Sequence, residues 1–171
     1  DFCLSRGLGD VYKRQELRVK TDSARTQIVQ FHNTGEFLDG ISMKKLSCTH
    51  ESLTSGTSGE GDHKKDLLIT MFLPQLELLK EDEPKIHIVD TFHDTYCKSF
   101  MQNSNVIAFS FLPIRKKKSI IGYIMVQWCS WNKVDSLDEN VISKELEDAR
   151  VLIEFQLLQQ LKQQKCKKNK K

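Results

Sequence analysis

Apolar positions along the chain follow two different spacings, and these spacings predict the order of strands and helices. Alternating or continuous apolar runs rich in β-branched and aromatic residues are typical of strands. They occupy residues 26–32, 42–50, 86–89, 106–114 and 119–128. Apolar residues recur at helical intervals over residues 66–80, 92–103 and 136–164. The pattern predicts an α+β domain that ends in a long helix, with Asp135 or Ser136 placed to cap it.

Polar and turn-forming segments mark where the earlier elements end. Residues 33–35, Asn-Thr-Gly, predict a turn between the first two strands. Pro74 interrupts a helical pattern and predicts two short helical pieces. Residues 51–65 are rich in Ser, Thr and Gly. We therefore expect this segment to be a mobile loop, too polar to pack on the core.

The succession of elements over residues 86–128 resembles the distal half of a GAF domain. A short strand ends in Asp90, a helix follows, and the next strand ends at Pro113. A basic turn then leads into a returning strand that opens with Ile121 and Gly122. The resemblance implies a GAF-like central antiparallel sheet of five to six strands with helices on its faces. It also implies a pocket between one face of the sheet and the loops that cross it.

The proximal half carries a second set of signature residues. An Arg precedes the first strand, Phe-His-Asn and a Gly stand at its end, and a Ser-Met-Lys strand ends in Glu. These residues are Arg25, Phe31, His32, Asn33, Gly35, Ser42, Met43, Lys44 and Glu51. The set resembles an uncharacterised Phe-His-Asn-Gly subgroup of GAF-like proteins, some of them encoded by phages. One departure from that pattern is Thr34, which lengthens the turn between Asn33 and Gly35.

The two resemblances together imply six ligand-binding residues. They are His32, Asn33, Glu51, Asp90, Phe92 and His93. Three of these have an alternative role: His32 suits capping of the turn, Asp90 suits capping of a helix that begins at Phe92, and Glu51 suits an exposed strand end. GAF ligands include cyclic nucleotides, bilins, haem, amino-acid-like metabolites and simple anions. The resemblance therefore predicts a pocket without naming its ligand or any cofactor.

The cysteines favour a reducing compartment. Cys48, Cys97, Cys129 and Cys166 are irregularly spaced and include no Cys-x-x-Cys pair, so we expect a cytoplasmic protein. Cys48 and His50 stand two apart on one strand face, but zinc sites use two such pairs. We expect no metal. Cys97 is followed by Lys rather than by the His that adjoins a bilin-bearing Cys in GAF photoreceptors, which argues against bilin attachment.

The formal charge of +3 is misleading because it is carried by the two ends of the chain. Residues 5–15 resemble a translated sequencing adapter, so we assign residues 1–15 to an artefactual segment. The last ten residues, 162–171, hold six lysines and no acid, and we expect residues 165–171 to form a basic disordered tail. The intervening part is net acidic, which argues against nucleic-acid binding. Residues 16–164 then form a single GAF-like domain with a truncated N-terminal helix.

Three functions fit these observations. We expect a non-enzymatic domain that senses a small molecule, because no catalytic residues are evident. An enzyme of the free methionine sulfoxide reductase type is the first alternative, since those GAF-fold enzymes use pocket cysteines. A structural dimerisation module with a vestigial pocket is the second. We expect a homodimer through residues 136–162, since the last helix outlasts the sheet. The native N-terminus that the artefactual residues 1–15 replace is where we expect a membrane anchor or partner-binding segment.

Overall fold

The computed structural model describes residues 15–36, 42–93 and 95–168. A helical stretch at residues 15–20 precedes the strands and the other helices. In chain order these are β1 (Arg25–Glu36), β2 (Ser42–Leu53), β3 (Leu67–Leu68), α2 (Leu73–Leu78), β4 (His87–Ile88), α3 (Thr95–Asn103), β5 (Ala108–Lys116), β6 (Ser119–Trp128), α4 (Trp131–Val134) and α5 (Glu139–Lys168). Short 3₁₀ turns, η1 (Ile69–Phe72), η2 (Leu79–Glu81) and η3 (Val89–Thr91), adjoin α2 and β4.

Six strands in the described part of the chain form one antiparallel sheet. Their spatial order is β3-β2-β1-β6-β5-β4, so β1 and β6 lie at the centre although they are far apart in sequence. The two long hairpins, β1–β2 and β5–β6, meet along the β1–β6 pair, where Arg25 faces Gln127 and Gln30 faces Gly122. The predicted α+β class, the six-stranded antiparallel sheet and the long last helix are confirmed.

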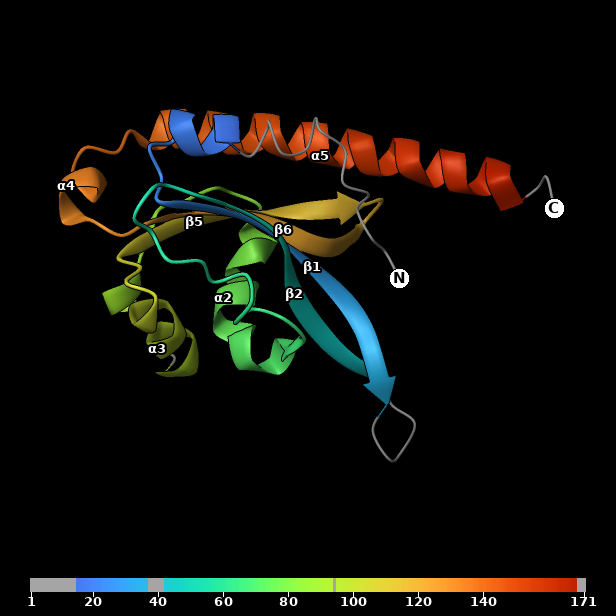
Figure 1. Cartoon of the computed structure of the whole chain (residues 1–171), viewed down its shortest axis with the longest axis horizontal. Helices are drawn as coiled ribbons and strands as arrows, with labels where there is room; N and C mark the ends of the chain where they lie inside the picture. The colour runs from blue at the N-terminus through green and yellow to red at the C-terminus, as the bar shows by residue number, and fades with distance from the viewer. Residues whose placement is uncertain (1–14, 37–41, 94, 169–171) are drawn as a thin grey trace.

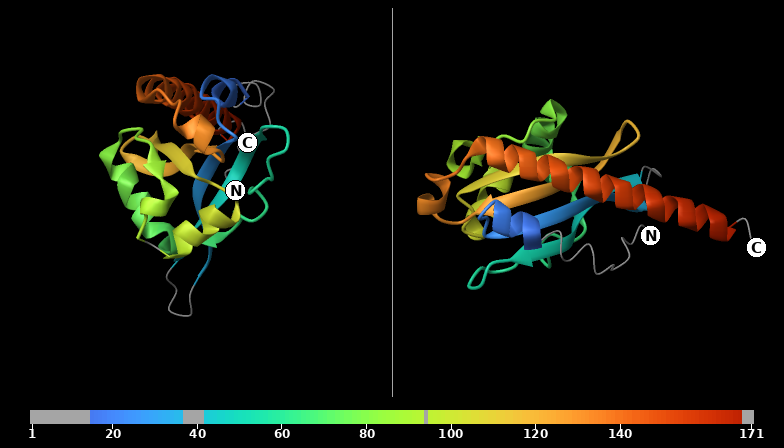
Figure 2. Two further views of the ribbon diagram at one scale, coloured as in Figure 1. Left: turned by 90° about the vertical axis from the view of Figure 1, so that its left-hand side faces the viewer. Right: turned by 90° about the horizontal axis from the view of Figure 1, so that it is seen from above.

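Helices cover both faces of the sheet (Figures 1 and 2). The long helix α5 and the helical stretch at residues 15–20 lie on one face, and α2 and α3 lie on the other. Alternation along β1 sends Ile28 to the α5 face and Val29 to the α2 face, and each joins a separate buried cluster. Trp128 joins the first cluster, and its indole N–H donates to the Thr21 carbonyl at 3.0 Å.

The predicted turn at residues 33–35 is wrong. β1 continues to Glu36, and Asn33 pairs with Lys44 while Glu36 pairs with Ser42. A register shift between these two pairs absorbs the extra residue of the Asn-Thr-Gly segment. Turn-forming residues therefore sit here inside an irregular strand end, and the link between β1 and β2 falls on residues 37–41, outside the described part.

The predicted helix starts are also shifted. α5 begins at Glu139 rather than near Ser136, because the Asp138 carboxylate accepts the Asn140 N–H at 2.9 Å and caps it. The short helix α4 occupies the preceding segment. Helix α3 begins at Thr95, so Asp90 does not cap a helix starting at Phe92. Pro74 stands in the first turn of α2, directly after η1, which confirms two short helical pieces.

Candidate functional site

A buried polar network centred on Arg25 lies at one end of the sheet, on the face that α2 and α3 cover. Its Nη1 donates to Glu60 Oε1 at 2.9 Å and to Gln127 Oε1 at 2.8 Å. Its Nε and Nη2 donate to the carbonyls of Ser58 and Ser104, each at 2.9 Å. One guanidinium therefore ties together β1, β6, the end of α3 and the 54–65 loop, the segment that follows β2.

Lys64 adds a second buried cation to this network. Its Nζ donates to Gln27 Oε1 at 2.9 Å and to Glu60 Oε2 at 3.2 Å, and it lies 5.4 Å from the centre of the Phe100 ring. The Lys64 carbonyl also accepts the Cys48 N–H. Arg25, Glu60 and Lys64 are each only 1% exposed. Such burial of charge is tolerated because every ion has a counter-ion and hydrogen bonds.

Glu51 fastens the 54–65 loop from β2. One carboxylate oxygen accepts the Glu60 N–H at 3.0 Å and the Gln27 amide at 2.8 Å, and the other accepts the Gly61 N–H at 3.2 Å. The prediction that this segment is too polar to pack is wrong: Glu60 and Lys64 fold inward and meet partners on the sheet, while Asp62 and Lys65 stay exposed. Glu51 therefore holds a loop in place, and its oxygens point to protein donors.

The charges around Glu60 set its ionisation. Burial alone would raise the pKa of the Glu60 carboxyl, but the nearby Lys64 and Arg25 charges outweigh burial and hold that pKa below its usual range. The carboxylate is therefore charged at neutral pH. With two buried cations and the carboxylates of Glu51 and Glu60, the network balances its own charge.

An open groove lies farther along the same face, beside α2. Its volume is about 580 Å³, and its walls come from β1, β2, α2 with its 3₁₀ turns, and the start of β6. The lining residues are Phe31, His32, Asn33, Lys44, Ile69, Leu73, Leu76, Glu77, Lys80, Ile120 and Ile121. The groove thus has an apolar interior with polar side chains around it, as small-molecule sites have.

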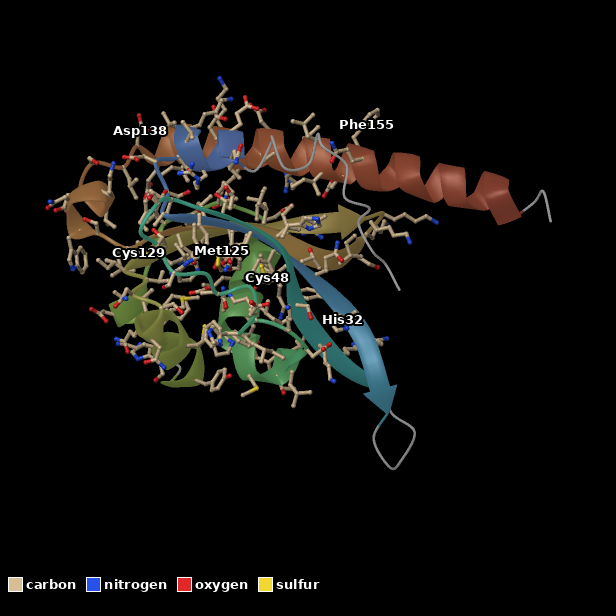
Figure 3. The ribbon with its side chains drawn as sticks, viewed as in Figure 1. His32, Cys48, Met125, Cys129, Asp138 and Phe155 are labelled. Carbon is tan, nitrogen blue, oxygen red and sulfur yellow. The ribbon has the colours of Figure 1, made fainter. Side chains whose placement is uncertain are left out.

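Two of the six predicted ligand residues, His32 and Asn33, line this groove. His32 lies on the long β1–β2 hairpin, at the opposite end of the sheet from Cys129 (Figure 3). A hydrogen bond of 2.8 Å joins His32 Nε2 to Ser47 Oγ, and Asp66 Oδ1 stands 3.6 Å away. These contacts from β2 and the following segment hold the ring in place while leaving it partly exposed.

The structure places the other predicted ligand residues elsewhere. Asp90 is exposed and lines a separate, smaller hollow of about 330 Å³, where its Oδ1 accepts the Gln102 amide at 2.9 Å. Phe92 packs edge-on against His87, with ring centres 6.2 Å apart, and His93 is exposed. The distal half of the predicted site therefore does not meet His32 and Asn33 in one cavity.

Three buried polar side chains in or beside the sheet have no hydrogen-bond partner for one of their atoms among the described residues. These atoms are Gln75 Nε2, Ser110 Oγ and Tyr123 Oη. Gln75 uses its oxygen to accept from the Cys97 thiol at 3.4 Å. Sequence patterns did not single out these residues, since an isolated Gln, Ser or Tyr in an apolar stripe is not a motif.

Cys48, Cys97 and Cys129 are free thiols. Cys48 and Cys97 are buried and Cys129 is half-buried. Burial raises the pKa of the Cys48 thiol to about 12, although the Lys64 charge opposes that rise. Burial also raises the pKa of Cys129. In the described ranges, no three His, Cys, Asp or Glu side chains cluster as a metal site would require, and no helix there has the length and apolarity to cross a membrane.

Helix α5 carries apolar side chains into solvent. Val151, Leu152 and Phe155 are all exposed, the last by 58%. Figure 3 shows Phe155 well along α5, distant from the helix start at Asp138. A hollow of about 360 Å³ between α5 and the helical stretch at residues 15–20 includes Val151 and Leu152. These residues lie within residues 136–162, for which the dimer contact stays a prediction.

Comparisons with known proteins found no matching protein-family model and no matching curated protein. The chain is similar to a domain from a protein of Sinorhizobium meliloti 1021 described as a two-component sensor histidine kinase. Identity is 16%, the TM-score is 0.60, and the match covers 96% of this chain and 99% of that one. It is also similar to the GAF domain of Thermosynechococcus elongatus PixJ in its blue-light absorbing form, with 13% identity, a TM-score of 0.55, and coverage of 95% and 96%.

A third similar structure is the chromophore-binding domain of Stigmatella aurantiaca phytochrome P1. Identity is 14%, the TM-score is 0.59, and the match covers 88% of this chain and 54% of that one. At these identities the comparison concerns architecture. The likenesses agree with the six-stranded sheet and with the helices on its two faces, and the chain has a GAF-like fold.

Proposed function

We propose that this chain is a non-enzymatic, cytoplasmic regulatory domain that binds a small molecule in the groove beside His32. The observation that carries the proposal is the groove itself. Its volume of about 580 Å³ falls within the size range of ligand sites, and it combines an apolar interior with His32, Asn33 and two lysines. Asn33, which faces Lys44 across the β1–β2 pair, gives the groove a neutral hydrogen-bonding group beside that lysine.

The cysteines support a binding role over thiol catalysis. A reactive thiol has a lowered pKa and an accessible sulfur, whereas Cys48 is buried with a pKa raised to about 12. Cys97 is also buried. The similar structures include GAF domains of photoreceptors and a domain of a protein described as a sensor kinase. By analogy with those proteins, we assign this chain to signalling.

The exposed face of α5 supports a homodimer as the regulatory assembly. Val151, Leu152 and Phe155 would be covered by a second copy of α5 within the proposed contact region, residues 136–162. Ligand binding at the groove would then be transmitted through the sheet, whose opposite face packs against α5.

A thermal-shift screen of metabolites and nucleotides tests the ligand proposal. A true ligand raises the melting temperature of the protein as its concentration exceeds its dissociation constant. Leu73→Trp, which fills the groove at a residue 48% exposed, should abolish the shift. The matched control is Val19→Trp at a residue 65% exposed in the helical stretch at residues 15–20, outside the groove and the proposed dimer contact, which should preserve it. A shift that survives Leu73→Trp would place the ligand elsewhere, and no shift with any compound would count against the sensor function.

A further inference from the structure

The side chains that line the groove also indicate the chemical class of its ligand. Resting on the proposed function, we infer that the ligand is an amphipathic monocarboxylate, an aliphatic chain with one carboxylate at its end. The inference joins two features of the groove, its aliphatic interior and its excess of cations.

The interior of the groove is mainly aliphatic. Five branched aliphatic side chains and one aromatic ring line it. They are Phe31, Ile69, Leu73, Leu76, Ile120 and Ile121. The Phe31 ring already packs edge-on against Tyr123, with ring centres 6.0 Å apart. Because stacking of a nucleobase or bilin needs an open aromatic face, this lining suits methylene groups better than a flat ring system.

The polar groups of the groove carry more positive than negative charge. Lys44 comes from β2 and Lys80 from η2, and Glu77 is the one carboxylate among the described lining residues. Glu77 Oε1 lies 4.0 Å from Lys80 Nζ, and both side chains are largely exposed. An exposed pair at this distance is weak, so both lysines can attract an anion. Asn33, which pairs with Lys44 across the β1–β2 hairpin, adds a hydrogen-bonding group beside them.

The same lining argues against a phosphate group. Proteins recognise phosphate most specifically with bidentate arginines or with successive backbone N–H groups of a glycine-rich turn, which lysines supplement as point charges. The described lining residues of the groove include neither Arg nor Gly. Two lysine ammonium groups suit the smaller charge of a carboxylate, and the aliphatic interior holds its chain.

Isothermal titration of the full chain with decanoate and with 1-decanol, a matched pair that differs in the charged end, tests this inference. We expect decanoate to bind at least about tenfold more tightly than 1-decanol, because the alcohol cannot make a charge-assisted contact with the lysines. The double variant Lys44→Met/Lys80→Met should bind the two compounds equally. Lys133→Met, at an exposed lysine paired with Asp22 outside the groove, should keep the preference.

The outcomes separate this inference from the function on which it rests. Equal binding of decanol and decanoate to the unaltered chain would overturn the carboxylate assignment and retain an apolar ligand groove. Failure of both compounds to bind, together with a positive hit of another class in the thermal-shift screen, would overturn the assignment as well. Binding to phosphatidylglycerol vesicles without binding to free decanoate would identify a membrane surface instead. Failure of every compound would count against the groove as a ligand site.

Discussion

Arg25 and Glu60 are 35 residues apart in the chain, and their side chains form a 2.9 Å ion pair that is closed to solvent. The pair joins the first residue of β1 to the 54–65 loop. Lys64 reaches the second oxygen of Glu60, so one carboxylate contacts two buried cations. The loop is therefore held on the sheet by charge pairing together with hydrogen bonds to Arg25 and Glu51.

Glu60→Gln should destabilise the fold strongly. The substitution keeps the shape of the side chain but leaves Arg25 and Lys64 buried without their shared counter-ion, at a cost of about 3–5 kcal/mol in the free energy of unfolding. Urea denaturation measures the loss. Asp62→Asn is the control, because Asp62 is exposed and pairs with the neighbouring Lys65. Equal effects of the two substitutions would show that the buried pair contributes nothing.

Acid should weaken the fold through the same carboxylate. The pKa of Glu60 is lowered in the folded state, so its contribution to stability is complete above the unfolded value of about 4.3. That contribution is lost as the pH falls through the lower folded value. Stability measured from pH 7 down to pH 3 should therefore drop in the unaltered chain. Glu60→Gln should show a smaller drop, and parallel curves would contradict this expectation.

Gly122→Ala should disrupt the centre of the sheet. A Cβ on Gly122 would stand 2.2 Å from the Val29 carbonyl oxygen in the neighbouring strand. Since backbone cannot yield as a flexible side chain does, we expect a loss of about 1–3 kcal/mol or more. Thermal unfolding gives the comparison, with Gly61→Ala as a control, because there the nearest atom belongs to the Glu51 side chain at 3.2 Å. A normal melting temperature for Gly122→Ala would refute the close β1–β6 approach.

Phe155→Asp should convert the proposed dimer to a monomer. The side chain is 58% exposed on α5, so the single chain does not depend on its burial. Placing a charge at this contact excludes a second apolar helix while leaving the domain folded. Light scattering coupled to size-exclusion chromatography measures the mass before and after the change. A monomeric unaltered chain at high concentration would rule out the proposed dimer.

The fold could be predicted from sequence because its signals are local. The strand patterns of β5 and β6, the polar turn between them and the apolar stripe of α5 each lie within a short window, and the structure confirms those elements. Helix starts moved by a few residues because several polar residues competed for the cap. Asp138 caps the helix in place of Asp135 or Ser136 because its carboxylate reaches the Asn140 N–H.

The polar network could not be predicted, because its partners lie far apart in the sequence. Residues 54–65 look unpackable when taken alone, and only the return of the chain beside β1 gives Glu60 and Lys64 their partners. The groove could not be predicted for the same reason, because residues distant in the sequence form it. His32 was singled out by its neighbours in sequence, but Leu73, Lys80 and Ile121 join it through three separate elements. Asp90, predicted for the same site, lines another hollow.

The central proposal is that the groove beside His32 is the ligand site of this domain. Amide chemical shifts of the ¹⁵N-labelled full chain, followed during a titration with decanoate, test it most directly. We predict that saturable shifts concentrate at His32, Lys44, Leu73 and Ile121 while Glu60 and Lys64 stay unchanged. Shifts confined to the hollow between α5 and residues 15–20, or an unchanged spectrum, would contradict the claim.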